Sequence, residues 1–203
     1  MRRLWGRLTS VNVQKAIWGL DEAGLAYERI DAGGAFGVVS DPAYRALNPN
    51  GLVPTLEEDG FALWESNAIL RYLAATSPAL ALPEDPRARA HVDQWLDFQA
   101  TSFTPAMRDA FWQLYRSPEP DRDLIASSLK KSEALAEILE AHLTDRAYVV
   151  GDGFGIADIA IGCAVHRWLN LPAERIERPA LRRWYERIAA RPGAATALGE
   201  PIG

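Results

Sequence analysis

Two adjacent polar residues, Glu65 and Ser66, are the side chains of this 203-residue chain best placed to bind a ligand. They follow a predicted strand over residues 61–64 and open a helical pattern of apolar residues. An earlier strand is expected to start at Val53-Pro54, where proline lacks the N–H that a central strand donates. A carboxylate and a hydroxyl at a helix N-terminus, beside an interrupted strand, suit a peptide-like ligand.

A second polar pair, Ser10 and Asn12, precedes the first helical pattern of the chain. Apolar residues at positions 13, 16, 17 and 20 have helical spacing, so we expect a helix from about Asn12 to Gly24. Serine and asparagine are both common helix caps, and capping is the simpler interpretation of this pair. Their side chains could instead act on a ligand, and the residues alone leave both roles open.

The composition restricts the classes of partner. The chain is 48% hydrophobic and 24% charged, with a net charge of −5 and no clustered basic stretch, so we expect no nucleic-acid partner. We see no signal peptide and no run of about 18 apolar residues, so we expect no membrane segment. The single cysteine, Cys163, excludes an internal disulfide and favours the cytoplasm. His91, His142 and His166 lack metal-ligand spacing, so no metal is expected.

The periodicity predicts two regions of different class. The first 75 or so residues have the order β-α-β-α-β-β-α, which is typical of a layered α/β domain with a mixed sheet. Prolines between Thr76 and Pro86 indicate a linker. Every later pattern is helical, over residues 87–116, 121–143, 156–169 and onward from 179. Pro105 should kink or split the first of these helices, and the third is apolar nearly all round, as a buried central helix is.

Four short segments follow one another along the chain: Ser10–Lys15, Asn48–Pro54, Glu65–Ile69 and Gly151–Asp158. In sequence and in order, they resemble motifs of the cytosolic glutathione S-transferases. The first is similar to the Ser-x-Asn active-site loop of bacterial, theta- or Nu-like members. The resemblance implies a thioredoxin-like N-terminal domain over 1–77 and an all-α C-terminal helical domain over 87–203. The fourth segment implies a folding role for Asp158, which has capping-box spacing from Gly155.

The resemblance implies that Ser10 and Asn12 are the catalytic residues. A free thiol has a pKa of about 8.5, so glutathione needs groups that favour its thiolate. The Ser10 hydroxyl can donate a hydrogen bond to the sulfur, and the helix beginning near Asn12 adds its positive dipole end. Together they would lower the thiol pKa by about one to two units. Which residue dominates is open, and our hypothesis puts Ser10 first.

The same resemblance assigns glutathione-binding roles to Val53, Pro54, Glu65 and Ser66. Glu65 would pair with the γ-glutamyl ammonium, and Ser66 would bind its carboxylate. Val53 would offer its backbone to the cysteinyl amide, with a cis bond to Pro54. Leu52 departs from the family pattern, in which a basic or amide side chain often reaches the glycyl carboxylate, so another donor must serve or glutathione binds more loosely.

A stripe on the first long helix of the second region is a candidate acceptor pocket. Phe103, Met107 and Phe111 share one helical face, with Arg108 adjacent. Such a stripe is more often part of a core than of a pocket, and both interpretations stay open. As a pocket it would suit a small hydrophobic electrophile that builds negative charge.

The leading functional hypothesis is a glutathione transferase in detoxification, with glutathione as co-substrate and a homodimer as the expected assembly. Two alternatives follow from the same resemblance. One is a glutathione-dependent disulfide or peroxide reductase, and the other is a non-catalytic binding module of the same fold.

Overall fold

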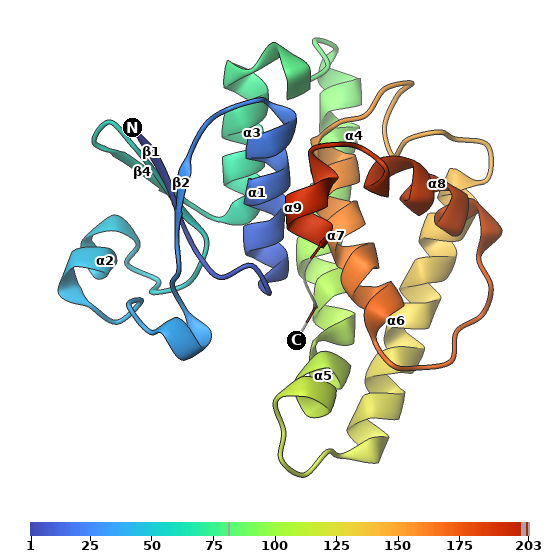
Figure 1. The fold of residues 1–203 in the computed structure, drawn as a ribbon. Helices are drawn as coiled ribbons and strands as arrows, with labels where there is room; N and C mark the ends of the chain where they lie inside the picture. The colour runs from blue at the N-terminus through green and yellow to red at the C-terminus, as the bar shows by residue number, and fades with distance from the viewer. Residues whose placement is uncertain (81, 200–201, 203) are drawn as a thin grey trace. The chain divides into compact units, whose positions relative to one another are not determined.

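The computed structural model describes residues 1–80, 82–199 and 202, and its contacts divide the chain into two compact units (Figure 1). Unit 1 comprises residues 1–82 and 190–202, and unit 2 comprises residues 83–189. Within the described residues, no helix is both long enough and apolar enough to cross a membrane.

Unit 1 is built on a four-stranded mixed sheet, as the sequence predicts. Strand order is β2-β1-β3-β4, with β1 parallel to β2 and antiparallel to β3, and β3 antiparallel to β4. The elements are β1 (Arg2–Trp5), α1 (Val11–Glu22), β2 (Glu28–Ile30), the 3-10 turn η1 (Gly34–Phe36), α2 (Pro42–Leu47), β3 (Thr55–Glu58), β4 (Phe61–Trp64), α3 (Ser66–Thr76), the 3-10 turn η2 (Pro78–Leu80) and α9 (Ala194–Leu198).

Helices cover both faces of this sheet. Leu4 of β1 and Leu56 of β3 are partners in the ladder, and both are fully buried. The next residue of β1, Trp5, points to the opposite face because side chains alternate along a strand. Its ring meets Tyr44 of α2 edge-on, with centroids 5.7 Å apart. Figure 1 shows α2 on one side of the strands and the α1–α3 pair on the other. The predicted layered α/β arrangement is thereby confirmed.

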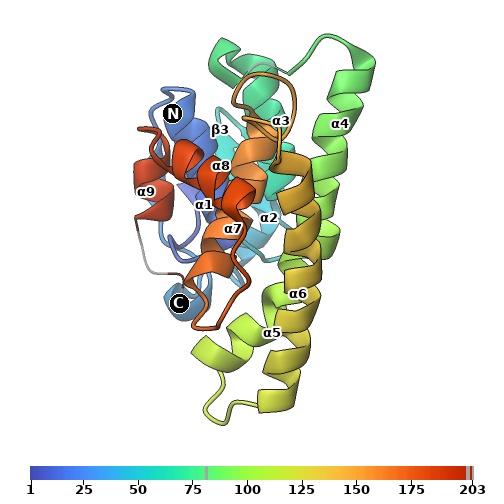
Figure 2. The same ribbon diagram turned by 90° about the vertical axis from the view of Figure 1, so that its right-hand side faces the viewer.

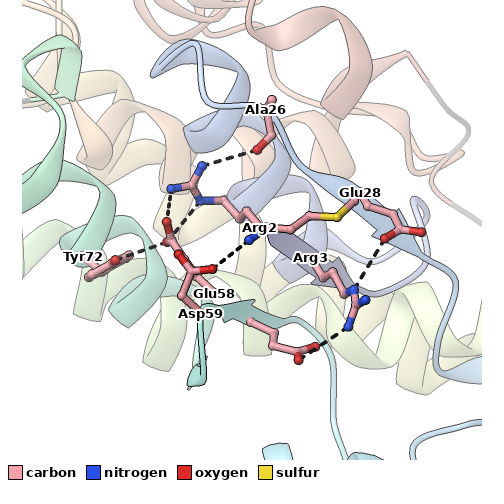
Figure 3. A network of polar contacts seen from close by, with 9 residues as sticks. Arg2, Arg3, Ala26, Glu28, Glu58, Asp59 and Tyr72 are labelled. Atoms are coloured by element: carbon pink, nitrogen blue, oxygen red, sulfur yellow. Dashed lines mark hydrogen bonds and ion pairs between the residues drawn. The ribbon is translucent and has the colours of Figure 1, made fainter.

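Ion pairs connect three neighbouring strands near the N-terminus (Figure 3). The Arg2 guanidinium of β1 is paired with the Glu58 carboxylate of β3. Arg3 lies 3.5 Å from Glu28 of β2 and 3.7 Å from Glu57 of β3. Partly exposed pairs contribute little individually, about 0–1 kcal/mol each. Their arrangement across the ladder therefore favours this register rather than adding much stability.

Unit 2 is entirely helical within its described residues. It contains α4 (Pro86–Asp97), the wide π-helical segment η3 (Phe98–Phe103), α5 (Thr104–Tyr115), α6 (Arg122–Leu143), α7 (Ile156–Asn170) and α8 (Pro179–Ala189). The expected break at Pro105 is confirmed, because η3 separates α4 from α5 just ahead of it. A proline inside a helix removes one N–H and pushes the preceding turn apart.

Helix α7 is the centre of unit 2. Twelve of its 15 residues are buried, as its uniformly apolar sequence predicts. Helices α4 and α8 both contact it, and Figure 2 shows α8 beside it. The Asp158 carboxylate accepts hydrogen bonds from the N–H groups of Val149 (2.9 Å) and Gly155 (3.0 Å) and from the indole of Trp184 (2.8 Å). Asp158 therefore ties the start of α7 to the preceding loop and to α8.

The C-terminal segment differs from the expected division of the chain. We expected one helical domain over 87–203, but residues 190–202 group with unit 1 because α9 packs on α1 (Figure 1). An ion pair between Arg191 and Glu22 fixes this segment, with Arg191 Nε 2.9 Å from Glu22 Oε1. A five-residue, alanine-rich helix gives no usable periodicity, so the sequence did not indicate α9. Residues 200, 201 and 203 of the expected domain lie outside the described residues.

Replacing Arg191 is expected to loosen this segment. The Glu22 side chain is only 9% exposed, so Arg191→Met leaves a nearly buried carboxylate without its partner. We expect the free energy of unfolding to fall by about 1–3 kcal/mol in urea titrations. The control is Arg182→Met, which breaks a weak pair between side chains that are both about two-thirds exposed, and should change stability by less than about 0.5 kcal/mol. Equal effects of the two substitutions would contradict the structural role of Arg191.

Candidate functional site

A depression in unit 1 brings together the two polar pairs singled out in the sequence. It is open to solvent, with an empty volume of about 280 Å³. Four segments form its wall: the start of α1, the loop between α2 and β3, the end of β4 and the start of α3. The lining residues are Asn12, Asn48, Asn50, Leu52, Val53, Pro54, Trp64, Glu65 and Ser66.

The contact between α1 and α3 positions Asn12 beside Ser66. Gly19 of α1 has no side chain, and a Cβ there would lie 2.9 Å from Leu70 of α3, so these helices pack closely. One turn nearer the site, Lys15 Nζ of α1 donates to Asn67 Oδ1 of α3 over 2.8 Å. A further turn along, Ser66 Oγ lies 3.2 Å from Asn12 Oδ1. The packing of α1 against α3 therefore brings together Asn12 and Ser66, which are 54 residues apart in sequence.

Glu65 stands at the junction of β4 and α3 in an unusual backbone conformation. Its φ is 70° and its ψ is 110°, and its side chain makes no capping hydrogen bond to α3. A residue with a side chain held in such a sparsely populated region stores about 1–3 kcal/mol of strain. The residue is exposed, so its carboxylate is available to a ligand at the rim of the depression.

The loop ahead of β3 is held by a network of hydrogen bonds. The peptide bond between Val53 and Pro54 is cis. Asn48 Nδ2 donates to the Leu52 carbonyl (2.9 Å) and to Thr55 Oγ1 (3.0 Å). Asn48 is 2% exposed, so this network is shielded from water. The loop presents a fixed backbone at Val53, where we expect the ligand's amide.

Ser10 is the N-cap residue of α1, but its side chain does not cap the helix. Its carbonyl accepts the first helical hydrogen bond, from the Gln14 N–H over 2.9 Å, while the side chain makes no capping bond. Ser10 is 9% exposed and is not among the residues that line the depression. The observed geometry thus places Asn12 rather than Ser10 against Ser66, and the role of the Ser10 hydroxyl stays a prediction.

Leu52 remains the exception in its segment. It is 64% exposed and lines the depression without a polar side chain. Among the described residues of the lining, Glu65 is the one charged group and none is cationic. Asn48 and Asn50 supply amide groups nearby, and we did not name them as site residues although both belong to the quoted Asn48–Pro54 segment. Their place in the same segment as Leu52 is the feature of the sequence that could have indicated them as site residues.

The four residues of the expected acceptor pocket all lie in unit 2. Phe103 and Met107 are 0% and 1% exposed. The centroids of the Phe103 and Trp168 rings are 6.3 Å apart, and this contact favours a packing role for Phe103. Phe111 is half-buried and Arg108 is exposed. Their contribution to an acceptor pocket stays a prediction.

His142 and His166 each make a polar contact within unit 2. Among the described residues, no group of three or more His, Cys, Asp or Glu side chains is placed to hold an ion. The His142 Nε2 lies 2.7 Å from the Val149 carbonyl, and burial lowers the pKa of this histidine. His166 Nδ1 lies 2.6 Å from the Tyr185 hydroxyl. Both contacts hold helices and loops of unit 2 together.

Comparison with known proteins gives a consistent result over both units. The family model for the glutathione S-transferase N-terminal domain matches residues 9–76, and that for the C-terminal domain matches residues 103–192. Glutathione S-transferase GstB of Escherichia coli strain K12 is 40% identical over 207 residues, which cover 100% of both chains. The probable glutathione S-transferase GSTF2 of Oryza sativa subsp. japonica is 31% identical, over 95% of this chain and 93% of its own.

Solved structures resemble the whole chain. A theta class glutathione S-transferase from the citrus canker pathogen Xanthomonas axonopodis pv. citri, with glutathione bound, superposes with a TM-score of 0.95 at 44% identity, over 100% of this chain and 99% of its own. A glutathione S-transferase from Pseudomonas fluorescens superposes with a TM-score of 0.86 at 34% identity, over 95% and 96% of the two chains.

Proposed function

The chain belongs to the glutathione S-transferase family, and from that premise we propose how its site binds glutathione and activates the thiol. It is a glutathione transferase with glutathione as co-substrate. The observation that carries the proposal is the junction at Glu65 and Ser66, at the start of α3. Glu65 has a strained backbone and an exposed carboxylate, and the buried hydroxyl of Ser66 lies beside Asn12.

The γ-glutamyl end of glutathione binds at this junction. Its ammonium pairs with the Glu65 carboxylate, and its carboxylate lies at the N-terminus of α3, where free N–H groups and the helix dipole favour an anion. The cysteinyl amide pairs with the Val53 backbone, which the hydrogen bonds of Asn48 hold in place. Both Nδ2 protons of Asn48 are already donated to Leu52 and Thr55, so the carboxamide of Asn50 is the lining group proposed to serve where Leu52 offers no donor.

The thiol is then activated at the start of α1. Because Ser66 donates its hydroxyl proton to Asn12 Oδ1, the amide of Asn12 is oriented with its Nδ2 group turned away from Ser66. The Nδ2 group and the Ser10 hydroxyl are the two donors proposed for the thiolate, with the α1 dipole as third contributor. Each donor favours the thiolate over the thiol, so both lower the pKa of bound glutathione.

The resulting thiolate attacks an electrophilic carbon of a small hydrophobic acceptor, by substitution or conjugate addition. We further propose that this chain is of the Ser-x-Asn, theta- or Nu-like type, in keeping with its similarity to the theta class structure. A homodimer, a cytoplasmic location and a detoxification role are proposed on the same family basis. Phe103, Met107, Arg108 and Phe111 remain the candidate acceptor residues.

Replacing Glu65 tests the binding half of the proposal. We expect Glu65→Gln to raise the KM for glutathione about 10- to 100-fold in a chloro-dinitrobenzene conjugation assay, because a charged pair becomes a neutral contact. Glu65→Gly should lose glutathione as well, yet unfold no more easily, because glycine adopts a φ of 70° without strain. The control is the exposed Glu84→Gln, with unchanged KM.

Two further assays separate the alternatives. Retention on immobilised glutathione, followed by parallel conjugation and disulfide-reductase assays, measures which reaction the thiolate serves. Reductase activity without conjugation would overturn the transferase mechanism. A wild-type protein that fails to bind glutathione at millimolar concentration would contradict the whole proposal, including the site.

A further inference from the structure

A second pocket lies in unit 2, between the end of α7 and the start of α8. Its empty volume is about 370 Å³, including the space open to solvent. The loop over 171–178 closes one side. The lining residues are Trp168, Leu169, Arg175, Ile176, Glu177, Arg178, Leu181 and Arg182. Three arginines and one glutamate make this wall positive.

The guanidinium groups of this pocket are incompletely neutralised. Arg178, with only 9% of its side chain exposed, donates through one nitrogen to the carbonyl (2.9 Å) and carboxylate (3.0 Å) of Glu133. Arg175 donates to two backbone carbonyls, of Leu171 (2.7 Å) and Ala173 (2.9 Å). Among the described residues, no carboxylate forms an ion pair with Arg175. The partly exposed Glu133 carboxylate thus pairs with Arg178, while the half-buried Arg175 is held by backbone carbonyls.

Three N–H donors of the lining residues also lack acceptors. They are the Nε atoms of Arg175 and Arg178 and the indole Nε1 of Trp168, all covered by surrounding atoms. Buried donors without a partner are unfavourable, and most buried polar groups in folded proteins are satisfied. The three covered N–H groups themselves are therefore shielded from water. Arg175 is half-buried, so part of its guanidinium can be reached by an entering ligand.

The rest of the wall is apolar and aromatic. The Arg175 guanidinium stacks 5.0 Å from the centre of the Trp168 ring, and Leu181 is 1% exposed beneath it. Ile176, at the rim, is 67% exposed, and exposure of a large apolar side chain to water is unfavourable. Guanidinium groups bind carboxylates in a fork and stack on flat rings.

We propose that this pocket is a binding site for a small aromatic carboxylate, separate from the glutathione site. The carboxylate meets Arg175, with Arg178 adding charge from beneath, and the ring lies against the apolar surface formed by Trp168, Leu181 and Ile176. The site lies wholly in unit 2 and shares no residue with the depression of unit 1. Occupancy is therefore independent of glutathione.

Benzoate binding to the full-length protein tests this proposal, with its neutral counterpart benzamide as ligand control. We expect saturable binding of benzoate by calorimetry, with a Kd below about 5 mM. The affinity for benzamide should be lower by a factor of about ten or more. In parallel, benzoate should shift the indole N–H resonance of Trp168, assigned by its loss in Trp168→Phe. Saturating glutathione should leave the benzoate affinity unchanged.

Variants locate the binding. Arg175→Met should weaken benzoate about tenfold. Ile176→Asp, at an exposed position where folding is not at risk, should do the same by placing a carboxylate at the rim. The matched control is Arg187→Met on α8, outside the pocket, which should stay within about twofold of wild type. Benzoate affinity unchanged in both pocket variants, or competition by glutathione, would overturn the proposal.

Discussion

Ser10→Ala is expected to lower kcat/KM for glutathione conjugation about 10- to 100-fold, with the pKa of bound glutathione raised by about one unit. The reason is the loss of a hydroxyl donor that favours the thiolate. Stopped-flow absorbance of the thiolate against pH measures the pKa, and steady-state kinetics measures the rate. Stability should change little, because the Ser10 side chain makes no capping hydrogen bond to α1. A capping role would instead lower stability by about 1 kcal/mol and leave the thiol pKa unchanged.

Asn12→Ala distinguishes the two proposed thiolate donors. It removes the amide and also the acceptor of the Ser66 hydroxyl, so we expect weaker glutathione binding together with slower chemistry. The exposed Ser40→Ala serves as control for both, with wild-type kinetics. If Ser10→Ala left the thiol pKa and kcat/KM unchanged while Asn12→Ala abolished activity, Asn12 would be the principal donor.

Asp158→Ala is expected to lower the free energy of unfolding by about 2–4 kcal/mol. The substitution leaves three N–H groups without acceptors, those of Val149, Gly155 and the Trp184 indole. All three are held at the centre of unit 2, where water does not replace the carboxylate; Asp158 itself is 1% exposed. Urea denaturation at neutral pH measures the loss. Asp152→Ala, in the exposed loop ahead of α7, is the control and should change stability by less than about 0.5 kcal/mol.

The same carboxyl gives stability a defined pH dependence. Burial raises the pKa of Asp158 to about 6, while its three hydrogen bonds act in the opposite direction and are outweighed. A folded-state pKa above the unfolded value of about 3.9 means that protonation favours folding. This contribution is fully present below about pH 4 and is lost as the pH rises through 6. The stability difference between wild type and Asp158→Asn should therefore shift by about 1.4 kcal/mol between about pH 5 and about pH 7.5, to the disadvantage of wild type.

A stability difference between wild type and Asp158→Asn that is the same at both pH values would contradict the raised pKa of Asp158. That result would mean that the three hydrogen bonds, rather than burial, set the ionisation of Asp158. The substitution to asparagine keeps the volume of the side chain, so a cavity does not complicate the comparison.

Local signals in the sequence determined most of the helices and strands. The helix over Pro42–Leu47 follows from an aspartate and a proline at its start, and the β3–β4 hairpin follows from the Asp59-Gly60 turn between two predicted strands. The break ahead of Pro105 follows from a missing N–H. The buried position of α7 follows from an apolar sequence on every side of the helix. Each of these effects acts between residues that are close in sequence.

Contacts between distant residues were decided only by the tertiary structure. The hydrogen bond between Ser66 and Asn12 spans 54 residues and exists because Gly19 lets α1 and α3 approach. An apolar stripe has the same spacing in a core as in a pocket, so periodicity could not show that Phe103 is fully buried. Helix α9 is held by an ion pair across 169 residues, which no local pattern encodes.

The sequence by itself thus determined the family and the order of elements, and it singled out Ser10 and Glu65 as candidate site residues. Side-chain type and short-range spacing are sufficient for those conclusions. The tertiary structure decided which of these residues meet, which polar groups lose water, and which carboxylate pairs with the nearly buried Arg178. Burial and long-range pairing depend on how helices pack, and packing is a property of the folded chain rather than of any segment.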